Sequence, residues 1–312
     1  MSKTAFVFPG QGSQYVGMGK DLYDELPVVR KYFNLANEIL GYDLTKIIFE
    51  GPEEELNKTE NTQPAILTLS YALYVTLEEK GIKAKIYGGH SLGEFTALTA
   101  AGVINFADAV RLVHVRGKLM QEAVPLGQGV MLAVMGIEKE ELVATVKKLQ
   151  EYGIMEIVNF NGGGQYVLAG ESKIKELTKT QLKEVGARKI VELPVSAPFH
   201  SSLMRAAALK FQEYLEKVEF LPPKVPVISN VTAEILTDPV KIKDLLSKQM
   251  ASPVLWEQSV LEMAKAEVTK FIEIGPGKVL TNLIKRIVPV ATFSVNNLES
   301  LRFLLDNPGE VG

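Results

Sequence analysis

A serine bracketed by glycines is the residue of this chain best suited to nucleophilic chemistry. The pentapeptide Gly89-His90-Ser91-Leu92-Gly93 follows a short apolar run, 84–87, and precedes a helix-like segment, 92–101. A strand, a Gly-X-Ser-X-Gly turn and a helix in this order are typical of a nucleophile elbow, in which a sharp turn exposes the serine hydroxyl. We therefore predict that Ser91 is a nucleophile; the alternative is a tight turn with an unreactive serine. The following helix points its positive end at Ser91, so the Leu92 N–H is placed to stabilise an oxyanion.

A serine nucleophile needs a base, and the chain contains 3 histidines. His90 adjoins Ser91, and its side chain is expected to point away from the hydroxyl. His114 falls on the polar face of its helix. Elimination leaves His200 as the predicted base, although a single histidine in a loop is usually structural. The sequence singles out no Asp or Glu that would orient the imidazole, and a backbone carbonyl could orient it instead.

An arginine interrupts an apolar helix face. In the helix predicted for 106–124, with Asn105 as its N-cap, apolar and polar residues fill opposite arcs. Arg116 lies in the middle of the apolar arc. Because arginine is rarely buried without an anionic partner, either a protein carboxylate or a ligand anion is expected to meet it. The adjacent elbow helix favours the ligand.

The first loop offers backbone amides to a ligand. It follows the strand predicted for 4–8 and has the sequence Pro9-Gly10-Gln11-Gly12-Ser13-Gln14. A dinucleotide-binding fingerprint would need a third glycine at position 15, where the chain has Tyr15. The glycines either let backbone amides approach a ligand closely or simply form a tight turn.

The elements that position these residues alternate along the chain. Helices are predicted for 21–40, 63–80, 203–217 and 254–266, and further strands for 226–229, 270–274 and 291–295. This alternation predicts a mostly parallel sheet covered by helices on both faces. The segments 130–135, 139–149, 156–161, 166–169, 172–185 and 189–193 follow the β-α-β-β-α-β order of a ferredoxin-like unit.

The ferredoxin-like pattern predicts an inserted small domain. We expect it to span 127–197, between the two parts of a large discontinuous domain, 1–126 and 198–312, whose last residues, 306–312, are frayed. A cleft between two domains is a common place for a ligand site. We therefore expect the ligand to bind between them.

Length and composition restrict the classes of function. A chain of 312 residues can hold a large domain with an insert. A net charge of −3 and a pI near 5.8 argue against a nucleic-acid-binding protein. The absence of cysteine excludes thiol catalysis, disulfides and thiolate metal sites. The N-terminal apolar run is too short for a secretory signal and no stretch is long enough to span a membrane, so a cytoplasmic protein is expected.

Several short motifs together resemble those of the malonyl-CoA:acyl carrier protein transacylases of type II fatty acid synthesis. They occur between about residue 4 and residue 295, in the order and spacing of that family. They are Pro9-Gly10-Gln11-Gly12-Ser13-Gln14, Gly89-His90-Ser91-Leu92-Gly93-Glu94, Arg116-Gly117, Asn159-Phe160-Asn161, Pro198-Phe199-His200 and Glu273-Ile274-Gly275-Pro276-Gly277.

The resemblance implies a fold and a set of site residues. The fold would be a hydrolase-like α/β core with a mostly parallel sheet and an inserted ferredoxin-like domain. Ser91 would carry the malonyl group and His200 would act as base. The remaining implied roles are an oxyanion hole formed by the amides of Gln11 and Leu92, a malonyl carboxylate site at Arg116, a main-chain carbonyl of Gln249 that orients His200, and an acyl pocket near Gln63, Met120, Phe199 and Asn159.

The resemblance also implies substrates and partners. A monomer would transfer malonyl from malonyl-CoA to the phosphopantetheine thiol of an acyl carrier protein, by a ping-pong mechanism without metal or bound cofactor. Such carriers are acidic, so a basic patch is expected near the cleft, with Lys189, Lys285 and Arg286 as candidates by resemblance. Phe199 is similar to the residue in polyketide acyltransferase modules that accept malonyl, whereas many stand-alone members have a smaller residue there. A malonyl or methylmalonyl acyltransferase of a polyketide pathway, a serine thioesterase and an inactive docking subunit are the alternatives.

Overall fold

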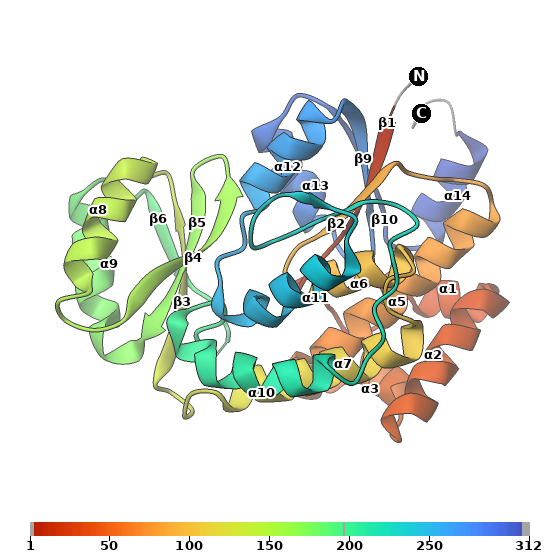
Figure 1. Ribbon diagram of the computed structural model, residues 1–312, viewed down its shortest axis with the longest axis horizontal. Coiled ribbons are helices and arrows are strands. Elements are labelled where there is room, and N and C mark those ends of the chain that lie inside the picture. The colour runs from red at the N-terminus through yellow and green to blue at the C-terminus, as the bar shows by residue number, and fades with distance from the viewer. Residues whose placement is uncertain (1–2, 196, 308–312) are drawn as a thin grey trace.

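Two β-sheets organise the chain in the computed structural model, which describes residues 3–195 and 197–307 (Figure 1). The larger sheet has the order β10-β9-β1-β2-β7-β8. Its strands are β1 (Lys3–Phe8), β2 (Ile86–Gly89), β7 (Val227–Ile228), β8 (Ile235–Leu236), β9 (Val268–Ile274) and β10 (Ala291–Val295). The paired strands are parallel except for β7 with β8, so the predicted mostly parallel sheet is confirmed.

Alternate residues of the central strand β1 divide the core into two layers. Phe6 and Phe8 lie in the larger hydrophobic cluster, whereas Ala5 and Val7 lie in a second cluster. The first layer contains α5 (Thr59–Glu79), α6 (Leu92–Ala100) and α7 (Phe106–Glu122), and the second contains α12 (Trp256–Lys265) and α13 (Val279–Ile287). Because successive strand residues point to opposite faces, a sheet covered by helices on both sides needs apolar residues at almost every position.

One predicted helix is wrong. The segment 21–40 forms two helices, α1 (Lys20–Glu25) and α2 (Pro27–Leu40), separated by Leu26 in an extended conformation (φ −112°, ψ 111°). A proline disfavours the helical conformation of the residue before it, and Pro27 suits the first position of a new helix because that position needs no N–H. Helices that the sequence analysis did not predict are α3 (Leu44–Glu50), α4 (Glu53–Asn57), α11 (Pro239–Lys248) and α14 (Leu298–Asp306).

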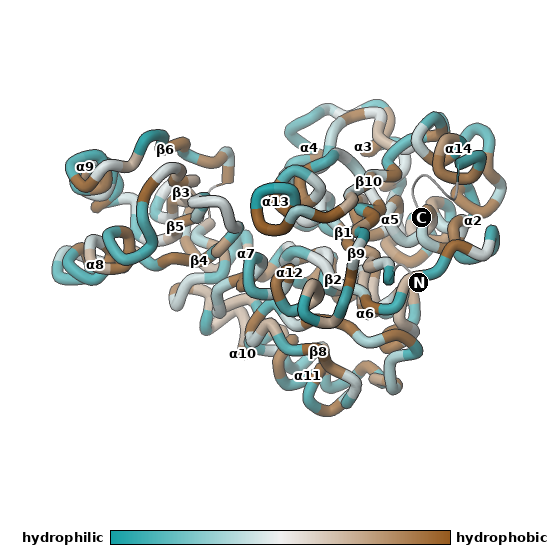
Figure 2. Tube along the Cα trace, turned by 90° about the horizontal axis from the view of Figure 1, so that it is seen from above, coloured by the Kyte–Doolittle hydropathy of each residue, from teal (hydrophilic) through white to brown (hydrophobic). Residues whose placement is uncertain are grey.

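The smaller sheet forms the unit shown at one side of the molecule in Figure 2. Its strand order is β4-β5-β3-β6, and every pair is antiparallel. Its elements are β3 (Gly129–Met135), α8 (Lys139–Leu149), β4 (Met155–Gly162), β5 (Gln165–Glu171), α9 (Lys175–Glu184) and β6 (Lys189–Glu192). When the four strands are numbered along the chain, their spatial order in the sheet is 2-3-1-4. This is the ferredoxin-like arrangement, so the predicted fold class is confirmed. The domain boundaries at 127 and 197 stay a prediction.

The two faces of this smaller sheet have different neighbours. Val130, Leu132 and Val134 form a separate hydrophobic cluster with residues of α8 and α9. Met131 and Ala133, which alternate with them, line a cavity next to the large sheet. The inserted unit therefore presents one face of its sheet to the rest of the chain.

The described part of the chain begins in β1 and ends just after α14. The first described strand, β1, and the last described helix, α14, both belong to the unit built on the larger sheet (Figure 1). Of the segment expected to fray, residues 308–312 lie outside the described residues, and Asp306 ends α14. In the described part of the chain, none of the helices combines the length and hydrophobicity needed to cross a bilayer.

Candidate active site

Ser91 lies in a strained turn between β2 and α6. Its φ of 53° and ψ of −108° fall where a non-glycine residue costs roughly 1–3 kcal/mol, as in nucleophile elbows. The turn also packs tightly, because a Cβ on Gly93 would lie 2.0 Å from the carbonyl oxygen of Phe8. The predicted order of strand, turn and helix is present, although β2 covers Ile86–Gly89 and not 84–87.

The Ser91 hydroxyl and the His200 imidazole form a hydrogen bond. Ser91 Oγ lies 2.7 Å from His200 Nε2, and His200 Nδ1 lies 2.9 Å from the main-chain oxygen of Gln249. A carbonyl can only accept, so Nδ1 carries the proton and Nε2 accepts from the hydroxyl. Burial, followed by the positive charge of Arg116, lowers the pKa of His200 to about 3, so the ring is neutral at physiological pH. A neutral imidazole in this position can remove a serine proton.

The other two histidines have different partners. His90 Nε2 lies 3.0 Å from Asn161 Oδ1, and its ring packs edge-on against Trp256. Burial lowers the pKa of His90. His114 Nδ1 lies 3.0 Å from the main-chain oxygen of Glu60. These hydrogen bonds agree with the prediction that His200, and not His90 or His114, is the base for Ser91.

Arg116 reaches the serine from the inner face of α7, with 1% of its surface exposed. Its Nη1 donates to Gln63 Oε1 at 2.9 Å. Its Nη2 donates to Ser91 Oγ at 3.1 Å and to Gln249 Oε1 at 2.8 Å. All three acceptors are uncharged, and Nε has no hydrogen-bond partner within residues 3–195 and 197–307. The guanidinium also lies over the Phe95 ring, 5.3 Å from its centroid. A buried guanidinium whose hydrogen-bond acceptors and ring neighbour are uncharged is suited to receive an anion.

Two residues that the sequence analysis did not single out connect the elbow to Gln249. Asn230, which follows β7, accepts from the Ser91 N–H at 2.6 Å and donates to the Gly89 carbonyl at 2.6 Å. The buried Glu94 carboxylate accepts from Gln249 Nε2 at 2.6 Å and from the Asn230 N–H at 3.3 Å. Glu94 interrupts an otherwise uncharged helix, the same signal that identified Arg116. Asn230 has no comparable signal among its sequence neighbours.

A cavity of about 300 Å³ opens above the serine, between the two sheets. It is lined by residues of both units, among them Gln11, Ser91, His200, Phe199, Asn159, Met131 and Gln165. Gln63 and Met120 lie behind it, fully buried beside Arg116, with Gln63 Nε2 3.7 Å from Met120 Sδ. Of the four predicted acyl-pocket residues, Phe199 and Asn159 line the cavity, whereas Gln63 and Met120 do not line it and Gln63 contacts Arg116.

The first loop packs against the backbone of the elbow. A Cβ on Gly10 would lie 2.4 Å from the His90 carbonyl oxygen, so only glycine permits this approach. The contact places the main chain of Gln11 next to Ser91, while the Gln11 side chain donates to Thr59 Oγ1 at 3.3 Å. Leu92, fully buried, is the first residue of α6. The two alternatives for these glycines are therefore compatible: Gly10 permits a tight backbone contact, and the same loop lines the cavity where a ligand could bind.

The predicted basic residues are exposed at one edge of the cavity. Lys189 on β6 pairs with Met135 on β3, which pairs with Gln165 on β5. Gln165 lines the cavity and accepts a hydrogen bond from Arg286 Nη1 at 3.1 Å. Lys285 precedes Arg286 on α13. Lys189 and α13 thus lie near the same edge, and their role in docking stays a prediction.

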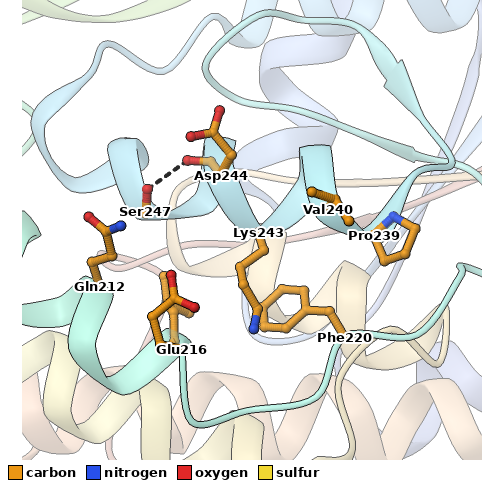
Figure 3. A pocket seen from close by; sticks show the side chains of 9 residues that line it. Gln212, Glu216, Phe220, Pro239, Val240, Lys243, Asp244 and Ser247 are labelled. Carbon is orange, nitrogen blue, oxygen red and sulfur yellow. Dashed lines mark hydrogen bonds between the residues drawn. The ribbon is translucent and has the colours of Figure 1, made fainter.

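A second groove lies between α10 (Arg205–Leu215) and α11 (Figure 3). In it, Lys243 lies over the Phe220 ring, 4.9 Å from its centroid, and the Ser247 hydroxyl donates to the Asp244 carbonyl at 2.7 Å. None of the predicted site residues lines this groove. We therefore assign the candidate active site to the cavity above Ser91.

Comparison with known proteins gives a consistent family. The family model described as the acyl transferase domain matches residues 5–299. The chain is 45% identical over 307 residues to the malonyl CoA-acyl carrier protein transacylase of Bacillus subtilis (strain 168), a match that covers 98% of this chain and 97% of that protein. It is 48% identical over 298 residues to the corresponding protein of Escherichia coli (strain K12), covering 95% and 96%. A solved complex of a type II PKS acyl-carrier protein with its malonyl-transacylase contains a similar chain, with a TM-score of 0.96, 45% identity and coverage of 98% and 100%.

Proposed function

The chain belongs to the acyl transferase domain family and is an acyltransferase, and we propose that it transfers malonyl from malonyl-CoA to the thiol of an acyl carrier protein. The observation that carries the proposal is the buried Arg116, whose guanidinium donates its hydrogen bonds to neutral oxygens and lies 3.1 Å from the Ser91 hydroxyl. A malonyl ester on Ser91 has a free carboxylate within reach of this cation. An acetyl ester has none, so it would leave the guanidinium desolvated and unpaired.

In the first half-reaction His200 Nε2 removes the Ser91 proton as Oγ attacks the thioester carbonyl. The Gln249 carbonyl holds the Nδ1 proton and stabilises the imidazolium that forms. The amides of Gln11 and Leu92 donate to the tetrahedral oxyanion, each contributing about 3 kcal/mol. When the C–S bond breaks, His200 returns its proton to the CoA thiolate, and free CoA leaves a malonyl ester on the serine.

The second half-reaction reverses these roles with a different thiol. The phosphopantetheine thiol of the carrier gives its proton to His200 and attacks the malonyl ester. The C–O bond breaks, Ser91 regains the proton, and the malonyl group leaves on the carrier. The mechanism is therefore ping-pong, and we propose that no metal or bound cofactor takes part, because each step moves only an acyl group and a proton. We propose a monomer, since one chain supplies every residue named in these steps.

Two other functions share the same intermediate. The second candidate function is malonyl or methylmalonyl transfer in a polyketide pathway. It is supported by Phe199 on the cavity wall and by the similarity to a transacylase that binds a type II PKS carrier. Such an enzyme would differ in its carrier or in accepting methylmalonyl, which the same arginine would also bind. A serine thioesterase would instead pass the malonyl ester to water.

The proposal is tested by following the acyl group. Intact-mass analysis after mixing with malonyl-CoA is expected to show one added malonyl group, located on the Ser91 peptide. Methylmalonyl-CoA and acetyl-CoA are compared in parallel, and acetyl is expected to load least. The malonyl ester should be stable until an acyl carrier protein is added. Rapid release of free malonate without carrier would indicate a thioesterase, and the absence of any mass increase would indicate an inactive docking subunit.

Carrier docking is expected to depend on the basic edge of the cavity. Reversing two exposed charges, Lys285→Glu with Arg286→Glu, is expected to lower the second-order rate of malonyl transfer to an acidic carrier by roughly 10-fold at low salt, since rim charges act mainly on association. The measurement is single-turnover transfer from enzyme already loaded with malonyl. Raising the salt concentration should reduce the difference between variant and parent.

The acceptor supplies the control for this experiment. Transfer to free pantetheine, which is uncharged, should be unaffected in the double variant. Lys210→Glu, an exposed reversal on α10, should behave like the parent with both acceptors. An unchanged rate with the carrier, or an equal loss with both acceptors, would exclude these residues from docking.

A further inference from the structure

The side-chain amide of Gln249 donates both of its hydrogens to acceptors at the N-terminal end of α6. Gln249 Nε2 donates to Glu94 Oε2 at 2.6 Å and to the Ser91 carbonyl at 3.0 Å. The amide oxygen therefore faces the other way, where it accepts from Arg116 Nη2 at 2.8 Å. Rotating the amide by half a turn would place its N–H groups against the donors of Arg116 and its oxygen against a carboxylate. Glu94 Oε2 accepts from the Asn230 N–H as well as from Gln249 Nε2, so it presents an acceptor to this amide and fixes its orientation.

Gln249 forms hydrogen bonds with both the proposed base, His200, and the proposed carboxylate-binding residue, Arg116. Its main-chain oxygen holds His200 Nδ1, and its side-chain oxygen holds Arg116 Nη2. Glu94 itself touches neither the imidazole nor the guanidinium. It also accepts from the main-chain N–H of Asn230, whose side chain holds the Ser91 N–H. The carboxylate thus lies one residue behind the serine, the imidazole and the guanidinium.

The placement of the negative charge favours a role in specificity. A carboxylate bonded directly to Arg116 would compete with the carboxylate of the substrate. Glu94 instead lies beyond the Gln249 amide, where it contributes an attractive charge to the guanidinium without accepting from any of its N–H groups. Burial raises the pKa of Glu94, while the bonds from Gln249 and Asn230 and the charge of Arg116 oppose this shift. The carboxylate is therefore costly to bury, and its partners are the groups that offset the cost.

We propose that Glu94 is a positioning residue for malonyl selection: it orients the Gln249 amide so that Arg116 is held beside Ser91, ready for the substrate carboxylate. The proposal rests on the malonyl transfer proposed above. It assigns Glu94 no contact with the substrate. A purely structural role, in which Glu94 only stabilises α6 and the Asn230 loop, predicts an equal loss for all acyl groups.

The test is the ratio of malonyl to acetyl loading on Ser91, measured by intact mass with the two CoA esters in competition. In Glu94→Gln, which keeps an acceptor but loses the charge, the ratio is expected to fall by roughly 10-fold, the usual size of such indirect effects. In Glu94→Met, which keeps neither, it should fall further. A ratio within one preparation does not depend on the folded fraction, so partial unfolding of a variant does not obscure the result. Thr99→Val, which removes a buried hydroxyl of α6 that donates to the Phe95 carbonyl, should leave the ratio unchanged.

A double-mutant cycle tests the route through Gln249. Gln249→Met keeps the main-chain carbonyl but removes the amide, so it should lower the same ratio. In that background Glu94→Gln should then lower the ratio no further, since its connection to Arg116 is already lost. Additive effects, or equal losses of malonyl and acetyl loading in the Glu94 variants, would overturn the proposal. If the parent protein loads no malonyl, the proposed function fails; if the parent loads malonyl and the variants keep its ratio, only the role of Glu94 fails.

Discussion

Replacing Ser91 with alanine is expected to abolish the malonyl ester and to lower transfer to the carrier by about 10⁴-fold or more, the usual loss when a serine nucleophile is removed. The substitution removes only the hydroxyl that lies 2.7 Å from His200 Nε2. The turn, the imidazole and the proposed oxyanion donors keep their backbone environment, so binding of malonyl-CoA should persist. Intact mass and steady-state transfer measure the two effects.

His200→Ala provides the companion variant. It should reduce transfer by a similar factor, and the double variant should be little worse than either single one, because a nucleophile and its base act as a unit. Ser247→Ala, which removes the hydroxyl bonded to the Asp244 carbonyl in the groove of Figure 3, is the matched control and should keep full activity. A Ser91→Ala protein that still gains a malonyl group would place the nucleophile elsewhere.

The sequence predicted the local parts of this site and of the fold. Alternating strands and helices implied the parallel sheet, and the β-α-β-β-α-β order implied the second sheet, since both patterns depend on short stretches of chain. The Asn105 cap and the glycines around Ser91 are equally local, and both occur where expected. Pro27 is a local sequence signal too, because a proline favours a break before it, but the prediction of a single helix over 21–40 relied on the apolar periodicity. The apolar pattern on either side of it continues in phase, so hydrophobic periodicity alone does not reveal the break.

The contacts that complete the site join distant segments, and periodicity carries no information about them. Ser91 and Asn230 are 139 positions apart, and Glu94 and Gln249 are 155 apart. The short strand β7 brings Asn230 beside β2, and a single turn, η3 (Gln249–Ala251), brings Gln249 beneath α6. Neither Asn230 nor Gln249 interrupts an apolar face, so neither produced a signal of the kind that Arg116 and Glu94 did. Only the resemblance to a known family pointed to Gln249.

The electrostatics of the resting site explain why a substrate anion matters. Arg116 is a buried cation whose three hydrogen-bond acceptors are the oxygens of Gln63, Gln249 and Ser91. Burial lowers the pKa of the guanidinium, and the charge of Glu94 opposes that shift from beyond the Gln249 amide. A malonyl carboxylate would add a charged, bidentate partner to a guanidinium whose present acceptors are neutral. The selectivity of the proposed reaction should therefore reside mainly in this one side chain.

Arg116→Ala is expected to lower kcat/KM for malonyl transfer by roughly 10²–10³-fold, the effect of removing one partner of a buried ion pair. Acetyl transfer, which makes no such pair, should fall much less, so the preference between the two acyl groups should narrow or invert. Arg116→Lys keeps the charge without the planar fork and should retain part of the preference. Competition between malonyl-CoA and acetyl-CoA, read by intact mass on Ser91, measures the preference directly.

A second arginine on the same helix is the control for this result. Arg111 is exposed on α7 and pairs with Asp108, so Arg111→Ala should leave both acyl groups unaffected. Arg116→Ala also removes the hydrogen bond to Ser91 Oγ. That loss affects malonyl and acetyl transfer equally, so it cancels in the ratio of the two rates. If Arg116→Ala lost malonyl and acetyl transfer by the same factor, the guanidinium would be serving the serine and not the carboxylate. A retained preference for malonyl would require that another group bind the substrate anion.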